Sequence, residues 1–396
     1  MDVILENSLK KKNQRADKAE EKLSLLMVIR QFYPLIGGTE RQAELLARML
    51  RESGFTITFI TAKLRKEWKR IESVGGLKVI RLPSPKIKVI GTLIYALSLI
   101  YYLIKHRKHY DIIHVHRADY DAVVTAPLGK LLGKKVLVKL ACSGPFGDIE
   151  TLMKSPISGF ALAMIANADK MVAVNEDIKK ELLKVGYEKD RILMIPNGVD
   201  ANTFRPITNS QPSKKKVVTF VGRLHEQKGL DYLLYSWKEL IESFKMSVSS
   251  FELHLNLIGE GPLKEKLVTV TEELGISKSV HLLGSVNNIA ECLQCTDVFV
   301  NSSLFEGISN SLLEAMACGL PIVATDISGN AELIQDDYNG LLVSPGDSKS
   351  LCNAIECLLK DVKKAKKLGM EARKTVEKRY SCPIIAKEYM EIYRCF

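Results

Sequence analysis

Short runs of β-branched and other apolar residues alternate with longer amphipathic stretches along the whole chain. Runs of this kind predict buried strands, and the stretches between them have the length of crossover helices. The expected strands of the first half lie at 23–29, 56–62, 78–82, 111–116, 135–140, 170–174 and 191–196. Those of the second half lie at 216–222, 252–259, 279–284, 297–303, 321–326 and 340–346. Two such series predict an α/β fold with two doubly wound, Rossmann-like domains built on parallel sheets.

A turn-rich, polar stretch at 196–217 separates the two series. Its composition is typical of a linker, so we place the domain boundary near Arg205. The first domain then covers residues 23–205 and the second covers residues 206–378, while a charged polar extension occupies residues 1–22. Because ligands of open α/β sheets bind beyond the carboxyl ends of the strands, two facing domains would hold a substrate in the cleft between them.

Charge is distributed unequally between the two halves of the chain. The formal net charge is +11, and residues 1–205 carry 35 lysines and arginines against 22 acidic residues, whereas residues 206–396 carry 22 against 24. A basic half attracts an anionic partner, which could be nucleic acid, anionic lipid or an anionic acceptor molecule. Because no nucleic-acid-binding motif accompanies the charge, we expect an acceptor or a lipid surface and no nucleic acid.

The apolar stretches bear on the location of the protein. The N-terminal leader is polar and lacks the apolar core of a signal peptide, which favours a cytoplasmic location. A run at 89–104 is apolar for 16 residues, fewer than the roughly 20 of a spanning helix, and the basic segment 105–109 follows it. We favour a core helix packed behind the first sheet. The alternative is that this run and its basic flanks rest on anionic lipid, as a peripheral contact at the inner face of the membrane.

Two glutamates, Glu306 and Glu314, stand eight positions apart in the second half. If a helix begins after Gly307, one carboxylate precedes its N-terminus and the other lies about two turns in. Gly307, Ser309 and Asn310 would leave backbone N–H groups open to a ligand, and the helix dipole there favours an anion such as phosphate. A carboxylate beside an anion site suggests hydroxyl groups beside phosphate. The alternative is an ordinary capped and buried helix in which the two acids are incidental.

Two loops with glycine follow expected strands. Gly37 and Gly38 precede an amphipathic stretch, where paired glycines let N–H donors approach a ligand, although a plain turn is the alternative. They have the spacing of neither a dinucleotide fingerprint nor a phosphate loop. Gly222 opens a second loop, in which Arg223 and Lys228 could bind one diphosphate as a fork and a point charge. A solvated charged turn is the alternative there.

The strand at 111–116 contains His114 and His116 on one face, because side chains alternate along a strand. His116 is nearer the carboxyl end, where it could hold a sugar hydroxyl or share a proton; a structural histidine is the alternative. The eight cysteines form no disulfide framework, and Cys292 with Cys295 makes one C-x-x-C pair without zinc-site partners. We therefore expect no metal site.

In their order and spacing these motifs make the chain resemble the retaining glycosyltransferases of family 4, which have the GT-B fold. The resemblance runs from about Leu23 to Phe396. It is most specific between Val218 and Asp347, where VGRLHEQKG, LIGEGPLKEKL, VHLLGSV, SSLFEGISNSLLEAMACGLPIVATD and NGLLVSPGD follow in the family's order. The family often has proline at the position of Ser309. A terminal helix at about 379–396 is similar to the one that packs back onto the first domain in such enzymes.

The resemblance implies metal-independent transfer, with retained configuration, of a sugar from a UDP- or GDP-sugar to a glycan or lipid-linked acceptor in cell-envelope or polysaccharide biosynthesis. The nucleotide sugar is a co-substrate, and no cofactor is implied. Glu314 would bind the ribose hydroxyls, Glu306 and His116 would lie near the transferred sugar, and Arg223 and Lys228 would bind the diphosphate. The remaining donor contacts would come from Gly37, Gly38, Gly222, Gly307, Ile308, Ser309 and Asn310.

Two other classes stay open. A sugar-nucleotide epimerase or a phosphorylase can share the two-domain fold, although we find no lysine site for the pyridoxal phosphate that a phosphorylase needs. A non-catalytic binder of sugars or nucleic acid on a disabled scaffold is disfavoured, because both cations and both glutamates are present.

Overall fold

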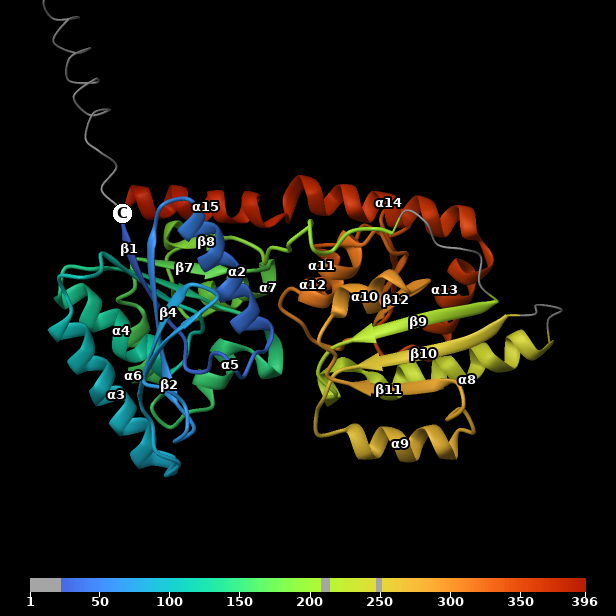
Figure 1. Ribbon diagram of the computed structural model, residues 1–396, viewed down its shortest axis with the longest axis horizontal. Coiled ribbons are helices and arrows are strands. Elements are labelled where there is room, and N and C mark those ends of the chain that lie inside the picture. The colour runs from blue at the N-terminus through green and yellow to red at the C-terminus, as the bar shows by residue number, and fades with distance from the viewer. Residues whose placement is uncertain (1–22, 208–213, 247–250) are drawn as a thin grey trace, which may run out of the picture.

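Two α/β domains lie side by side in the computed structural model, joined by long helices along one side (Figure 1). The structure describes residues 23–207, 214–246 and 251–396. The predicted extension at 1–22 and part of the predicted linker lie outside these residues. Each domain is built on a largely parallel sheet with crossover helices, so the predicted fold class is confirmed.

The strands found in the structure include every run predicted from the sequence. The first sheet has the order β3-β4-β2-β1-β5-β6-β7-β8 and the second the order β11-β10-β9-β12-β13-β14. Strands of the first sheet are β1 (Ser24–Val28), β2 (Thr56–Lys63), β3 (Ile71–Val74), β4 (Leu77–Pro83), β5 (Ile112–Val115), β6 (Lys135–Lys139), β7 (Lys170–Ala173) and β8 (Ile192–Met194). Strands of the second are β9 (Lys215–Val221), β10 (Glu252–Ile258), β11 (Val280–Gly284), β12 (Val298–Asn301), β13 (Ile322–Thr325) and β14 (Leu341–Val343).

One edge of the first sheet corrects the prediction of purely parallel sheets. β3, which the apolar pattern does not mark, pairs antiparallel with β4. The turn between them is Gly75-Gly76, with φ of +56° and +80°, and two left-handed residues give the twist that a tight hairpin needs. β3 was missed because its four residues lie half-exposed at a sheet edge and form no apolar run.

The helices connect these strands and cover both faces of each sheet. In the first domain they are α2 (Gly38–Glu52), α3 (Lys88–Lys105), α4 (Tyr120–Leu131), α5 (Asp148–Met153), α6 (Ser158–Ile165) and α7 (Glu176–Lys184). In the second they are α8 (Leu230–Met246), α9 (Lys264–Glu273), α10 (Ile289–Gln294), α11 (Asn310–Ala317), α12 (Ser328–Ala331), α13 (Ser348–Lys360) and α14 (Val362–Arg379). The last helix, α15 (Cys382–Cys395), lies beyond α14.

Side-chain alternation in β1 divides the core of the first domain into two layers. Leu25 and Met27 point into a layer with α2 and α15, whereas Leu26 and Val28 point into a layer with α3, α4 and α7. Because strands of a parallel sheet are buried on both faces, residues 25–28 of β1 are apolar without interruption. The sheet is thereby fixed between two helical layers, and only its strand ends face the second domain.

The chain passes between the domains twice, and the two passages are hydrogen-bonded to each other. The backbone N–H of Val199 donates to the carbonyl of Tyr380 at 2.9 Å, and that of Cys382 donates to the carbonyl of Val199 at 3.0 Å. α14 belongs to the second domain and α15 packs on α2 of the first (Figure 1). The Tyr393 hydroxyl of α15 lies 2.7 Å from His114 Nδ1 in β5, which ties the C-terminal helix to the first sheet.

The apolar run at 89–104 forms most of α3, and the favoured prediction of a core helix is wrong for one side of it. Tyr95, Leu99 and Leu103 are buried against the sheet, but the opposite side of the helix exposes large apolar side chains. No helix among the described residues is long and apolar enough to cross a membrane.

Candidate active site

The predicted site residues lie where the strand order of each sheet reverses. In the second sheet β10 and β11 follow on one side of β9, and β12, β13 and β14 follow on the other. In the first sheet the same reversal lies between β1 and β5. Loops diverge at such switch points and leave a crevice beyond the carboxyl ends of the strands. The two crevices face each other, since Asn310 Nδ2 of the second domain donates to the carbonyl of Gly38 of the first at 2.9 Å.

Lys228 and Glu306 meet at the β9–β12 crevice as an ion pair. Lys228 ends a one-turn 3-10 helix after β9, and the Ser302 hydroxyl donates to its carbonyl at 2.8 Å. Glu306 lies in the loop after β12, where the Ser303 hydroxyl donates to its Oε1 at 3.0 Å. Their side chains are only 13% and 10% exposed, so each charge depends on the other for compensation.

Arg223 lies in the same loop as Lys228 but, unlike Lys228, has no ion-pair partner among the described residues. Its side chain is exposed, and it forms no hydrogen bond or ion pair with other described residues. Gly222 before it is tightly packed, because a Cβ there would lie 2.9 Å from Phe220 Cζ. The structure therefore leaves a guanidinium group free to bind an anion at the mouth of the crevice.

The helix predicted after Gly307 is α11, and it begins at Asn310. Ser309 is its N-cap, with its hydroxyl accepting from the Leu312 N–H at 3.4 Å, and Asn301 Nδ2 donates to the same hydroxyl at 3.0 Å. The capped-helix interpretation is thus confirmed as local structure. It does not remove the other interpretation, because the loop before the cap lies at the contact between the domains, where Asn175 Nδ2 donates to the Gly307 carbonyl.

Glu314 is buried in the second turn of α11, and 8% of its surface is exposed. Burial raises the pKa of its carboxyl to about 7, and the Arg41 guanidinium of α2, 3.9 Å away, offsets this rise only in part. A carboxyl with little compensation is costly to ionise there. Hydroxyl donors of a bound molecule would favour the ionised form, so this carboxyl is suited to a sugar diol.

His116 lies at the carboxyl end of β5, stacked on His114 with ring centroids 4.1 Å apart, as the one-face prediction required. Burial lowers the pKa of His116 to about 3, so its imidazole is neutral at physiological pH. Its Nε2 atom is buried and has no hydrogen-bond partner among the described residues. This nitrogen is available to a hydroxyl group of a bound molecule.

A polar cavity of about 170 Å³ lies at the β1–β5 crevice, and His116 lines it. Sequence reasoning missed the charged residues of this cavity, which are Arg30, Glu40, Arg117, Asp119 and Asp121. Burial raises the pKa of Glu40, Asp119 and Asp121, with the nearby arginines lowering them in part. The available signal was the segment HRADYD directly after a buried strand, where charged residues are well placed to contact a ligand.

A second group that sequence reasoning missed joins the two domains. Lys139 at the end of β6 is buried, and its ammonium donates to Asn197 Oδ1 at 2.8 Å. Asn197 Nδ2 then donates to Asn310 Oδ1 at 2.9 Å and to the Ile308 carbonyl at 3.3 Å. Burial lowers the pKa of Lys139 to about 8. The signal was a lysine at the end of an otherwise apolar strand.

The glycine of the Glu306 loop is required by a contact between the domains. A Cβ on Gly307 would lie 2.0 Å from the Ala141 carbonyl oxygen, and Asn175 Nδ2 donates to the Gly307 carbonyl at 3.1 Å. We predict that Gly307→Ala destabilises this contact between the domains by about 1–3 kcal/mol. Thermal unfolding and small-angle scattering should show a lower Tm or a wider molecule. Gly159→Ala, in a site with no atom within 4 Å, is the control, and equal behaviour of the two variants would contradict the contact.

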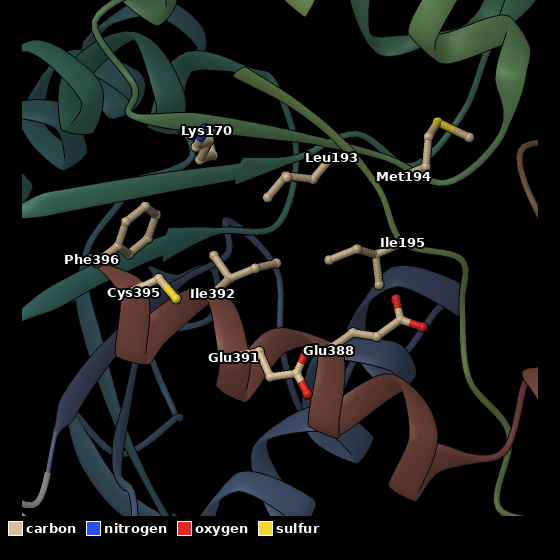
Figure 2. Close-up of a pocket in the computed structure, with 9 residues that line it drawn as sticks. All are labelled: Lys170, Leu193, Met194, Ile195, Glu388, Glu391, Ile392, Cys395 and Phe396. Atoms are coloured by element: carbon tan, nitrogen blue, oxygen red, sulfur yellow. The ribbon is translucent and has the colours of Figure 1, made fainter. Parts of the chain in front are cut away.

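An apolar cavity of about 440 Å³ lies elsewhere, between α15 and the edge strand β8 (Figure 2). Leu193, Ile195, Ile392 and Phe396 line it, with Glu388 and Glu391 at its border. None of the predicted site residues lines it. The described part of the chain holds no cluster of three or more histidine, cysteine or acidic side chains that could bind a metal ion.

Two protein families match the chain, one on each domain. The family described as Glycosyltransferase Family 4 matches residues 36–203, and Glycosyl transferases group 1 matches residues 215–361. Together these matches span both crevices.

Individual relatives are similar to this chain over most of their own length. EpsD of Bacillus subtilis is 31% identical over 310 residues, covering 72% of this chain and 77% of the relative. The UDP-Gal:α-D-GlcNAc-diphosphoundecaprenol α-1,3-galactosyltransferase of Escherichia coli is 27% identical, covering 82% and 85%. The crystal structure of Anabaena HepE in complex with UDP-glucose superposes with a TM-score of 0.76 at 18% identity, covering 94% of this chain and 100% of HepE. This similarity concerns the fold.

Proposed function

The chain is a member of the family 4 glycosyltransferases with the GT-B fold, and from this premise we propose that it transfers a sugar from a UDP-sugar to a glycan or lipid-linked acceptor. The observation that carries the proposal is the largely buried Lys228–Glu306 ion pair, which joins the loops after β9 and β12. Arg223 lies in the first of these loops, and Glu314 lies in the helix that follows the second. Two cations suit a diphosphate, and a buried carboxyl with a raised pKa suits the ribose diol. The choice of UDP is supported by the names of the Escherichia coli relative and of the HepE complex.

In the proposed reaction the bond between the anomeric carbon and the β-phosphate oxygen breaks. Negative charge then grows on the diphosphate, and Arg223 and Lys228 stabilise it in the transition state more than in the ground state. The N-terminus of α11 adds backbone donors and a favourable dipole at the same place. Because Lys228 and the N-terminus of α11 are held by the fold before the donor arrives, they need little reorganisation during the reaction.

Glu306 and His116 are proposed to hold the transferred sugar from the two domains. Glu306 is fixed by Lys228 and by the Ser303 hydroxyl, so it can accept from a sugar hydroxyl in one orientation. The unpartnered Nε2 of His116 offers a second contact from the facing crevice. We propose a front-face substitution, in which the departing phosphate takes the acceptor proton and the anomeric configuration is retained.

The acceptor is proposed to enter through the polar cavity of the first domain. Its arginines and buried carboxyls can bind hydroxyl or phosphate groups of an acceptor, and His116 places the cavity next to the sugar. The donor side and the acceptor side therefore belong to different domains. We propose that the protein works on the cytoplasmic side, where nucleotide sugars are available to it.

Donor preference is predicted from this assignment. UDP-sugars should raise the Tm by several degrees, and GDP- and ADP-sugars by less, because a ligand that binds the folded state stabilises it. A thermal-shift screen with UDP-, GDP- and ADP-sugars tests which nucleotide base the protein prefers. A larger shift with GDP-sugars would contradict the choice of UDP and leave the glycosyltransferase assignment in place.

The proposed use of cations in place of a metal predicts activity in the presence of a chelator. Release of UDP with an acceptor present should fall less than about twofold in excess EDTA, since each phosphate charge has a side-chain partner. Proton NMR of the product should show the anomeric configuration of the donor. Loss of activity that only a divalent ion restores would overturn metal independence.

The same experiments separate the alternative functions. An epimerase would convert the UDP-sugar without an acceptor and would release no UDP. A non-catalytic binder would show a thermal shift with neither transfer nor hydrolysis.

A further inference from the structure

The outer side of α3 is an apolar stripe on the surface of the first domain. Its side chains are between 43% and 61% exposed and recur at the spacing of one helix face. They are Ile90, Leu93, Leu97, Tyr101 and Ile104. Ile87 and Val89, at the start of the helix, are 56% and 80% exposed. Exposed apolar side chains scattered singly are ordinary, but a continuous stripe over a whole helix marks an interaction surface.

The helix lies flat on the domain. Its 18 residues span about 27 Å, and Tyr95, Leu99 and Leu103 fix its inner side to the sheet. α3 forms the outer margin of the first domain, away from the second domain (Figure 1). An inserted, spanning orientation is therefore excluded for this helix, while its outer side is open along its length.

The charges of the segment that forms the stripe are all of one sign. Residues 84–110 contain no aspartate or glutamate. Lys86 before the helix and Lys105, Arg107 and Lys108 at its end are exposed. Lys105 lies over the Tyr101 ring at 5.2 Å, so one cation lies directly against the stripe. An apolar helix face with basic residues at both ends is the arrangement by which an amphipathic helix binds a lipid surface.

We infer that the outer side of α3, with its basic flanks, docks the first domain on an anionic phospholipid bilayer. The apolar side chains enter the boundary between headgroups and acyl chains, and the lysines and arginine lie at the phosphate level. Lipid is favoured over a second copy of the chain, because two copies of this face would bring their cations together.

Docking in this way would bring the membrane close to the polar cavity. Tyr95, on the inner side of α3, has its hydroxyl 3.4 Å from Asp121 Oδ2, and Arg30 lies 4.3 Å over its ring. Arg30 also donates to the Thr92 hydroxyl at 3.3 Å. One helix thus separates the lipid-facing stripe from the cavity. The use of this cavity for a lipid-linked acceptor rests on the proposed function, whereas docking itself does not.

Vesicle flotation of the full chain tests the docking surface. The probes are phosphatidylcholine vesicles with and without about one third phosphatidylglycerol, at low salt and at about 0.5 M salt. We expect the wild type to float with the anionic vesicles and to bind less at high salt. Leu93→Glu/Leu97→Glu should lower the bound fraction at least about tenfold, since charge at the apolar boundary is unfavourable. Replacing Lys105, Arg107 and Lys108 by glutamine should weaken the salt dependence, because only the cations at the start of the helix remain.

A matched control uses exposed apolar side chains of the second domain, in Val362→Glu/Met370→Glu, which should bind as the wild type does. Hydrolysis of the UDP-sugar in solution should be the same in both double variants, which separates docking from transfer. Absence of wild-type binding to anionic vesicles at low salt would overturn the inference. Unchanged binding of Leu93→Glu/Leu97→Glu would do the same, as would a dimer in sedimentation that this variant dissociates.

Discussion

Replacing Lys228 by alanine is expected to lower the turnover number of sugar transfer by about 10²- to 10³-fold. A preorganised group that stabilises charge on the leaving atom has an effect of this size when it is removed. Lys228 is held in place by the hydrogen bond from the Ser302 hydroxyl to its carbonyl and by its ion pair with Glu306. Arg223→Ala should have a smaller effect on turnover, because its exposed guanidinium is screened by solvent. Steady-state kinetics with a UDP-sugar checks both.

Loss of Lys228 also leaves Glu306 without its cation, so stability has to be measured in parallel. Thermal unfolding of Lys228→Ala should show destabilisation that Lys228→Ala/Glu306→Gln relieves, because the double variant leaves no unpaired charge. Turnover should stay low in the double variant. Lys264→Ala removes an exposed ion pair with Glu260 and serves as the control, with turnover unchanged. If Lys228→Ala kept turnover within a few-fold of wild type, the leaving-group role would be wrong.

Glu314→Gln is expected to stabilise the protein without ligand at pH 8 and to have little effect at pH 4. The folded-state pKa of Glu314 is raised from 4.5 to about 7, so its contribution to stability is complete below pH 4.5 and is lost as pH rises through 7. That change amounts to about 3 kcal/mol at most. Glutamine stays neutral and avoids the loss. Denaturant unfolding of both proteins at several pH values checks this prediction. An equal pH dependence of the free energy of unfolding in the two proteins would contradict a raised pKa of Glu314.

Binding of the nucleotide sugar should instead favour the ionised form of the Glu314 carboxyl. Ribose hydroxyls donate to the ionised carboxylate, so UDP-glucose has to displace the proton that Glu314 holds below pH 7. We expect its Kd to rise about 20-fold between pH 7.5 and pH 5.5 in the wild type. Glu314→Gln should bind about 10- to 100-fold more weakly at pH 7.5, with no such dependence. Calorimetry in buffers of different ionisation enthalpy measures the released proton directly. His116, with a pKa of about 3, does not titrate in this range.

Much of the fold could be predicted because strands of parallel sheets are buried on both faces and are therefore mostly apolar. Runs such as 23–29 and 170–174 signal their own burial, and turn residues mark where they end. The Glu306–Glu314 spacing could likewise be interpreted from helix geometry, since a cap and a two-turn separation are local properties. The observed N-cap at Ser309 follows from that local chemistry.

The features of the fold and the site that could not be predicted depend on contacts between distant segments. Lys139 and Asn197 come together only when the ends of two strands meet the loop before α11, so neither stands out in the chain. The hairpin of β3 depends on pairing at a sheet edge, not on an apolar run. The 89–104 run has the composition of a core helix, and only its packing decides that one side of the helix stays exposed.

The most direct test of the two-crevice site is a crystal structure of the wild-type protein with UDP. The Arg223 guanidinium and the Lys228 ammonium should lie within hydrogen-bond distance of the β-phosphate, with Glu314 accepting from the ribose hydroxyls. Glu306 should stay beside the vacant sugar position, opposite His116. A nucleotide bound away from the β9–β12 crevice, or one whose ribose does not contact Glu314, would contradict the assignment of donor and acceptor to the two domains.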